Sequence, residues 1–401
     1  MVGRSRSSCH LPSRSTGSPS LRVLSWSLAL CAVPWLAGCR ESSANNQGSI
    51  AIPPSSVAAT GCSSTNQSFT NPLTEISTGL VLGPESQICA ARGGEVLYAT
   101  GAAARVYEII ADPVGATATS TLIIAPTEIQ AFYLAIGISD TPLVSGICVL
   151  DSSTLAVMEH TANVVLLVAR DGSGVLGIFA GSANTTPGFA DGFPGRLSFA
   201  EPGQIVPTGN DPAELIIADT GNDRIRIATG GALRTLSGTG NNTSVDGDLD
   251  EASFNLPSGL TIACNNRILV TEGNGERLRE IVITGASQVG FEGLTMTLAG
   301  GGSNAEGPGS DVQLAAPKAP YITADGETYW VDAGSSAPTV EATLRRQDIN
   351  GNVDCPLWVD CSTVPVGWPL TPGGTFSLTM TDSGALYILD AAGGAIYVIA
   401  P

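Results

Sequence analysis

The stretch that decides the fold is residues 213–240, AELIIADTGNDRIRIATGGALRTLSGTG. It holds three short runs in which apolar and polar residues alternate, and these runs are separated by Asp-Thr-Gly-Asn-Asp and by Thr-Gly-Gly. Alternation with a period of two, broken by turns that contain Gly and Asn, is typical of antiparallel strands joined by hairpins. The stretch therefore predicts three consecutive strands of one small antiparallel sheet.

The same unit recurs along the chain, and one residue marks each copy. A turn follows the second predicted strand of every copy, and the residues that open it are Thr100, Glu159, Asp219, Glu272, Asp332 and Asp390. Their spacings of 59, 60, 53, 60 and 58 residues indicate repeated supersecondary units. The sequence therefore predicts an all-β ring or array of six small sheets.

A second set of equivalent residues supports the repeat, and it lies in the segments that connect the predicted sheets. Three copies consist of an acid and a glycine, an apolar residue eight positions after the acid, and a proline eleven positions after it. They are Asp191-Gly192 with Phe199 and Pro202, Asp246-Gly247 with Phe254 and Pro257, and Glu306-Gly307 with Leu314 and Pro317. Three copies of one spacing indicate a connecting segment of constant structure.

These motifs carry a family resemblance. The segment IIADTGNDRIRI at residues 216–227 resembles the core of the NHL repeat, and SFNLPSGL at 253–260 resembles the connection between NHL repeats. The match is strong over residues 198–300 and weaker elsewhere. The resemblance implies a six-bladed β-propeller with four-stranded antiparallel blades. The sixth copy ends at Pro401 after three strands, so we expect the strand at residues 78–83 (TGLVLG) to complete that blade and close the ring.

The N-terminal part of the chain reads as an export signal. Residues 1–38 have a basic start and an apolar run that ends in Leu-Ala-Gly before Cys39, which resembles a bacterial lipobox. We expect residues 1–38 to be a lipoprotein signal peptide, Cys39 to be lipidated and residues 39–72 to be a flexible tether. Residues 73–401 are then the propeller. Arg40 gives no inner-membrane retention signal, so we expect lipid anchoring in the bacterial cell envelope, at the outer membrane.

The composition limits the partners of the chain. The formal net charge is −18, and Lys318 is the only lysine. Such an acidic chain repels nucleic acid and anionic membrane surfaces, so the lipid anchor is the only expected contact with the membrane. We expect a monomer whose partner is an envelope protein, a peptide or a polysaccharide. Simple solubility of an exported protein is the favoured explanation of the charge.

Cysteines outside the leader and the lipobox number six. Cys355 and Cys361, in CPLWVDC, are the expected disulfide of an exported chain. Cys89 and Cys148 lie eleven residues before their turn residues and are expected to be free core thiols. The sequence leaves open whether these two or Cys62 and Cys264 pair.

The marked acids have a structural explanation. An aspartate before Thr-Gly-Asn can accept backbone N–H bonds in its own turn, and an arginine five residues later can pair with it across the hairpin. Arginines stand five residues after the turn residue in three of the copies, at Arg105, Arg224 and Arg277. His160 is the only histidine after the leader, which excludes a zinc site with several histidines. We therefore expect no catalytic residues and no bound organic cofactor.

The best candidate metal ligands are Asp246, Asp248 and Asp250, followed by Glu251. Alternating carboxylates in one loop suit calcium, which prefers several oxygen ligands, although a solvated acidic loop has the same pattern.

Two functions fit the sequence. The first is a surface-anchored, non-catalytic module that binds a protein or another ligand through its loops and one mouth of the channel. An insertion near Trp358 and Trp368 is a candidate contact region, although core packing explains these tryptophans at least as well. The second is a calcium-dependent hydrolase or lyase, because similar six-bladed propellers include lactonases, esterases and lyases. The metal-ligand motifs of those enzymes have no residue-by-residue match in this chain.

Overall fold

A computed structural model of the chain describes residues 73–401, except 77, 183–185, 193–197, 210–212, 231, 264–266, 287–289, 324, 337–338, 358–360 and 362–367. The expected signal peptide and tether lie outside the described residues, as do Cys39, Cys62, Cys264 and Trp358. No helix among the described residues is long and apolar enough to cross a membrane.

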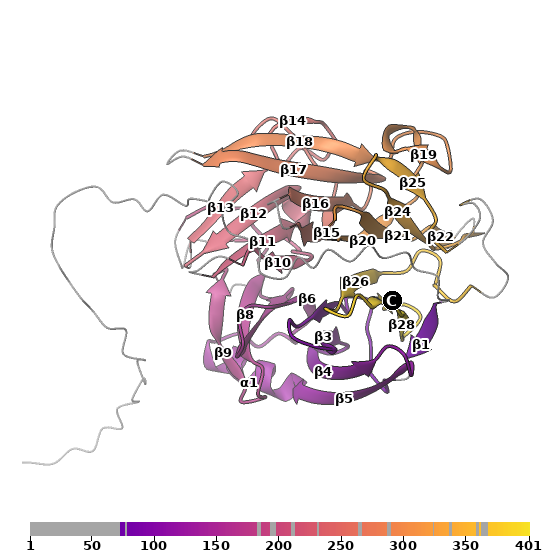
Figure 1. The fold of residues 1–401 in the computed structure, drawn as a ribbon. Coiled ribbons are helices and arrows are strands. Elements are labelled where there is room, and N and C mark those ends of the chain that lie inside the picture. Colours follow the sequence, from indigo (N-terminus) through magenta and orange to yellow (C-terminus); the bar gives the residue numbers. More distant parts are fainter. Residues whose placement is uncertain are drawn as a thin grey trace, which may run out of the picture. The chain divides into compact units, whose positions relative to one another are not determined.

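Six antiparallel sheets form a closed ring, which confirms the six-bladed propeller (Figure 1). Blade 1 contains β2 (Ile88–Ala90), β3 (Val96–Gly101), β4 (Arg105–Asp112) and β5 (Thr117–Ile124). Blade 2 contains β6 (Val144–Val149), β7 (Thr154–Glu159), β8 (Val164–Ala169) and β9 (Val175–Ala180). Blade 3 contains β10 (Ile205–Pro207), β11 (Glu214–Asp219), β12 (Arg224–Thr229) and β13 (Ala232–Ser237).

The remaining blades carry additions. Blade 4 contains β15 (Pro257–Ile262), β16 (Arg267–Glu272), β17 (Arg277–Ala286), β18 (Phe291–Ala299) and a fifth strand, β14 (Gly247–Asp248). Blade 5 contains β20 (Pro317–Ile322), β21 (Thr328–Asp332), β24 (Thr343–Gln347), β25 (Asn352–Asp354) and β19 (Gly307–Pro308), with a separate hairpin of β22 (Ser335–Ser336) and β23 (Thr339–Val340). Blade 6 contains β26 (Phe376–Met380), β27 (Leu386–Asp390), β28 (Ala395–Ile399) and β1 (Thr74–Ile76).

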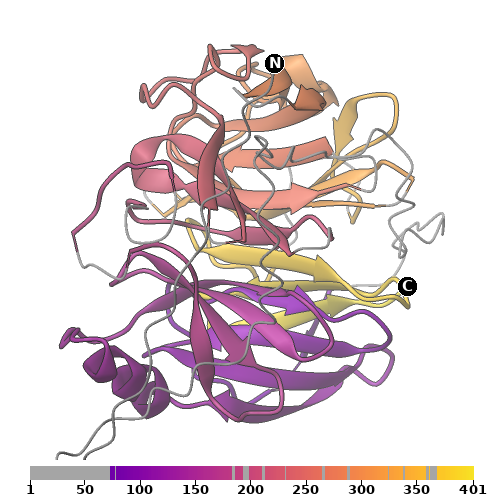
Figure 2. The same cartoon turned by 90° about the vertical axis from the view of Figure 1, so that its left-hand side faces the viewer.

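The contacts between elements join the innermost strands in a closed circuit, in the order β2, β6, β10, β15, β20 and β26. Neighbouring blades pack with their sheets face to face (Figure 2). Strand β11 shows why the sequence folds in this way, because all of its side chains are buried. Leu215 and Ile217 pack toward blade 2, whereas Ile216 and Ala218 pack toward blade 4. Both faces of a blade are therefore apolar, and burial against two neighbours stabilises it.

The ring closes through a different segment from the one expected. Thr74–Ile76 pairs with β28, with Ile76 opposite Ile396, whereas residues 78–83 form no strand. Gly79 has a φ of +65°, and the chain crosses from blade 6 to blade 1, where Leu80 and Leu82 pack into the core between those blades. The apolar alternation of residues 78–83 thus reflects packing between blades, while the closing strand contains Glu75 and lacks that signal.

A helix is present that the repeat did not predict. Helix α1 (Pro126–Ala135) lies between blades 1 and 2, buries Ile129 and Tyr133, and packs against β9. Its sequence signals are Pro126 in the first turn and Glu128, whose carboxylate accepts the N–H of Ala125 at 2.6 Å.

The acid-glycine column marks segments that cover the outer edges of blades 3–5. Gly192 exchanges two backbone hydrogen bonds with Leu233 in β13, and β14 and β19 pair with the outer strands β18 and β25. The apolar residues eight positions after these acids, Phe199, Phe254 and Leu314, are fully buried between neighbouring blades. Each connection therefore covers an outer edge before it enters the centre of the blade.

Candidate functional site

The six marked turn residues are all buried at the ends of the second strands. Each side chain accepts an N–H from the segment that enters the innermost strand of its own blade. The donors are Gln87 to Thr100, Leu143 to Glu159, Ala200 to Asp219, Asn255 to Glu272, Ala315 and Ala316 to Asp332, and Thr371 to Asp390. The column therefore ties each connection to its blade, and its carboxylates are not available to a ligand.

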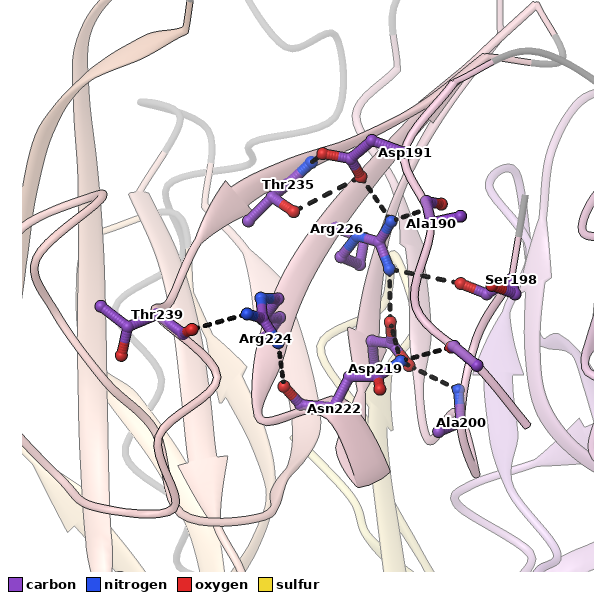
Figure 3. A network of polar contacts seen from close by, with 11 residues as sticks. Ala190, Asp191, Ser198, Ala200, Asp219, Asn222, Arg224, Arg226, Thr235 and Thr239 are labelled. Carbon is purple, nitrogen blue, oxygen red and sulfur yellow. Dashed lines mark hydrogen bonds and ion pairs between the residues drawn. The ribbon is translucent and has the colours of Figure 1, made fainter. Parts of the chain in front are cut away.

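Buried ion pairs complete this arrangement in blades 3 and 4. The Arg226 guanidinium lies 2.5 Å from Asp219 and 2.5 Å from Asp191, so one cation joins the two acid columns (Figure 3). In blade 4, Arg279 lies 2.6 Å from Glu272 and 2.8 Å from Asp246. Burial raises the pKa of Asp219, and the charge of Arg226 opposes that shift.

The expected pairing five residues after the acid is wrong. Arg224 stands opposite Asp219 in the hairpin, but its guanidinium donates to the carbonyls of Asn222 and Thr239 (Figure 3). Arg226 lies two residues further from the turn than Arg224 does. At that position its guanidinium forms ion pairs with both Asp219 and Asp191. Arg105 and Arg277 likewise donate to carbonyls of their own turns, those of Ala102 and Gly275.

Glu159 differs from the acids of blades 3 and 4. It accepts N–H bonds from Leu143, Thr161 and Ala162 but forms no ion pair with another described residue. The position that matches Arg226 holds the apolar Leu166. Burial therefore raises the pKa of the Glu159 carboxyl, partly opposed by its backbone hydrogen bonds. The neighbouring His160 is half-buried in the turn.

The loop proposed for calcium has a different arrangement. Asp246 binds Arg279 and accepts the hydroxyl of Thr297 at 2.9 Å, while Asp248 and Asp250 are exposed. Within the described part of the chain, no group of three or more His, Cys, Asp or Glu side chains could hold a metal ion. The structure therefore does not bring the three carboxylates together, because Asp246 is used in the ion pair.

A disulfide joins Cys355 and Cys361 in the insertion of blade 5. The backbone N–H of Cys361 donates to Glu306, the acid that corresponds to Asp246. Trp368 packs against a core cluster and donates its indole N–H to Ala342 at 2.7 Å. The described part of the insertion is thus held to the blade by its own polar contacts.

Cys89 and Cys148 are free thiols on the innermost strands of blades 1 and 2. Burial raises the pKa of Cys89 to about 12 and also raises that of Cys148. Thiols kept protonated in this way are poor nucleophiles, which fits core packing.

Polar residues gather at the end of the ring where the innermost strands begin, and this end is called the channel mouth below. Adjacent strands are joined there by hydrogen bonds from Thr100 to the carbonyl of Ser145 and from the N–H of Ile88 to Ser377. At the same mouth, the Gln87 amide oxygen and the Ser258 hydroxyl are buried and have no hydrogen-bond partner among the described residues. Buried polar atoms are normally satisfied, so these two oxygen atoms can pair with a water molecule or a ligand once neighbouring side chains move to expose them.

Lys318 contributes the only charge of an innermost strand at this mouth. It is the second residue of β20, as Ser258 is of β15, and these two strands adjoin. The side chain is half-buried, and its ammonium forms no ion pair or hydrogen bond with another residue that the structure describes. Burial lowers the pKa of Lys318, and the Glu85 carboxylate partly opposes this. Among the described residues, the mouth therefore contains an ammonium group without a partner and the buried, unpartnered side-chain oxygen atoms of Gln87 and Ser258.

Sequence reasoning missed this site. The composition singles out Lys318 as the only lysine, but its place on an innermost strand follows only from the ring. The prolines Pro257 and Pro317 could have located the site, because Ser258 and Lys318 each follow the proline of the second set of equivalent residues.

The fold and the site define a six-bladed propeller with a polar channel mouth. No family model matches the chain. A stretch of 109 residues is 32% identical to NHL repeat-containing protein 2 of Gallus gallus and covers 25% of this chain and 14% of that protein. The match thus spans a small part of the relative and supports the NHL likeness over part of the chain.

Solved structures that share the fold include the following two. A Bacteroides thetaiotaomicron protein of unknown function has a TM-score of 0.52 and 15% identity, covering 82% of this chain and 75% of that chain. A protein described as a candidate gluconolactonase has a TM-score of 0.50 and 11% identity, covering 82% and 92% of the two chains. At these identities the similarity shows the fold alone.

Proposed function

We propose that the protein is an exported, lipid-anchored, non-catalytic binding propeller whose ligand is an acidic saccharide held at the channel mouth. The observation that carries the proposal is that the Lys318 ammonium has no described partner at the mouth where the side-chain oxygen atoms of Gln87 and Ser258 are buried without hydrogen-bond partners. The lipid at Cys39 would hold the ring at the cell envelope, where saccharide polymers are available.

The chemistry of the mouth favours this ligand class. An ammonium group has three donors and no acceptor, so it binds a carboxylate through charge-assisted hydrogen bonds. Once side-chain movement exposes them, the amide oxygen of Gln87 and the hydroxyl of Ser258 can accept bonds from ligand hydroxyls. A sugar acid supplies one carboxylate and several hydroxyls. The net charge of −18 disfavours polyanions such as nucleic acid, whereas a single carboxylate can be neutralised locally by Lys318.

Calorimetry with D-glucuronate and the neutral D-glucose tests the proposal. We expect the protein to bind glucuronate more tightly than glucose, and Lys318→Met to weaken glucuronate binding roughly 10- to 150-fold, as expected for about 1.5–3 kcal/mol from a charged hydrogen bond. Lys318→Arg should retain part of the affinity. Equal binding of both sugars, or unchanged binding by Lys318→Met with a wild-type melting temperature, would contradict the proposal.

An assay for lactone and ester hydrolysis with added calcium tests the competing enzyme hypothesis. The binding proposal predicts no turnover. Turnover that disappears in Asp246→Ala or Asp248→Ala would instead establish a calcium-dependent enzyme.

A further inference from the structure

Among the residues that the structure describes, no segment pairs with the outer edge of blade 1, whereas described segments flank or pair with the outer edges of blades 2–5. Strand β5 is the last strand of its sheet and lies at the rim of the ring (Figure 1). Blade 2 is flanked at β9 by α1, and connecting segments pair with the outer strands of blades 3, 4 and 5. Within the described residues, no backbone hydrogen bond joins the outer side of β5 to another segment.

The unpaired edge follows from a short connection. In blades 2–5 the covering segment belongs to the connection that leads into the blade. Residues 238–256 and 300–316 precede blades 4 and 5, whereas only residues 77–87 lie between β1 and β2. The missing length corresponds to the part that carries the acid-glycine pair in the connections to blades 3–5 and to α1 in the connection to blade 2. Within the described residues, the chain that enters blade 1 contacts β5 through the Ser120 hydroxyl, which donates to the carbonyl of Thr78 at 2.7 Å, but it forms no backbone pairing with the outer edge of β5.

Strand β5 also lacks the usual protection of an exposed edge. Its sequence, TATSTLII, has no charge and no proline, although the chain as a whole is strongly acidic. Natural edge strands are commonly short, charged, interrupted by proline or covered, because a free edge can pair with another strand. At eight residues, β5 is as long as any outer strand except β18, which β14 covers. Its exposed Leu122 adds an apolar contact.

We infer that β5 binds β5 of a second copy in an antiparallel pair. The identical strand has a matching length and no charge, so the pair places no like charges opposite each other. An antiparallel pair of identical strands is also two-fold symmetric and closes as a dimer. An edge of eight residues buries less than the roughly 1,200 Å² of a stable interface, so the dimer is weak and depends on concentration. This dimer differs from the monomer that the sequence led us to expect. The inference does not depend on the proposed ligand.

Sedimentation velocity of the full chain carrying Cys39→Ser, over a range of concentration and salt, tests the inference. Because both copies are acidic, we expect the dimer fraction to rise with salt. Leu122→Lys should lower the association constant on the order of tenfold or more, since it places a charge on each facing strand. The matched control is Leu294→Lys in β18, because Leu122 and Leu294 are 45% and 47% exposed but only the β18 edge is covered.

Dimerisation that Leu122→Lys weakens and Leu294→Lys leaves unchanged would support the β5 interface. A chain that stays monomeric at the highest concentration and salt would overturn it, as would a dimer that both variants weaken equally. Melting temperatures of the two variants show whether either has lost its fold. Association that falls with salt would instead indicate charge-driven contact elsewhere on the surface.

Discussion

The guanidinium of Arg226 lies 2.5 Å from the carboxylate of Asp219, and neither side chain is accessible to solvent. Arg226 also binds Asp191, which belongs to the segment covering the edge of the same blade. One buried cation thus holds a strand, a turn and a connection together. Removing one member of a buried ion pair leaves an uncompensated charge, so this network matters more to stability than its individual hydrogen bonds suggest.

We predict that Arg226→Met lowers the free energy of unfolding by about 3–5 kcal/mol. Arg224→Met should cost clearly less, because the Arg224 guanidinium is only half-buried and binds backbone carbonyls. Urea denaturation of both variants measures the difference. Equal destabilisation by the two substitutions would mean that the ion pair has no special role.

The buried Glu159 should make stability depend on pH. Its pKa is raised by burial from 4.5, so the folded state binds this proton more tightly than the unfolded state does. The contribution of the protonated carboxyl is complete below pH 4.5 and is lost as the pH rises through the folded-state pKa. We expect the unfolding free energy to decrease with pH in this window, by at most about 1.4 kcal/mol per pH unit for one group.

Urea denaturation at a series of pH values measures this slope. Glu159→Gln should flatten it, although loss of an N–H acceptor also lowers stability at every pH. Glu201→Gln is the matched control because Glu201 is exposed. A wild-type slope in Glu159→Gln would show that the pH dependence comes from other groups.

Ring closure depends on Ile76, which is buried opposite Ile396. Ile76→Asp places a carboxylate in the core between blades 6 and 1, so we predict a loss of about 3 kcal/mol or more. Val81→Asp should cost little, because the Val81 side chain is about half exposed. Thermal unfolding compares the two variants, and the reverse order of stability would contradict closure by β1.

The lipid anchor proposed at Cys39 predicts a change of location. Cys39→Ser removes the thiol that would carry the lipid, so we expect the protein to move to the soluble fraction or to remain unprocessed. Membrane fractionation with mass measurement of the N-terminus distinguishes these forms. A variant that stays membrane-bound and is cleaved as in the wild type would rule out this anchor.

The repeat predicted the ring because every blade buries two apolar faces, and this requirement recurs in each copy. The closing strand at Thr74–Ile76 was missed because three residues, one of them Glu75, are too few to show a period. The partner of Asp219 was assigned to Arg224 rather than Arg226 because sequence spacing gives the register but not which arginine turns toward the carboxylate. Helix α1 was missed because it replaces a connecting segment.

The channel mouth was only partly predictable. The sequence placed binding at a mouth, but the unpartnered oxygen atoms of Gln87 and Ser258 depend on which polar atoms the folded chain leaves unsatisfied. The sequence alone suggests that Lys318 is an ordinary solvated charge. Its position on the innermost strand β20 is known only from the structure. The local sequence pattern is thus enough to predict the blades, whereas the residues of the site can be identified only from the tertiary structure.

The binding proposal is tested most directly by NMR of the single lysine. Because Lys318 is the only lysine, protein labelled with ¹³C-lysine gives one ε-methylene signal from the side chain. We predict that D-glucuronate shifts this signal in a saturable manner, whereas D-glucose causes no comparable shift. A lysine signal that stays unchanged at saturating glucuronate, or that responds equally to glucose, would contradict the assignment of Lys318 as the carboxylate-binding residue.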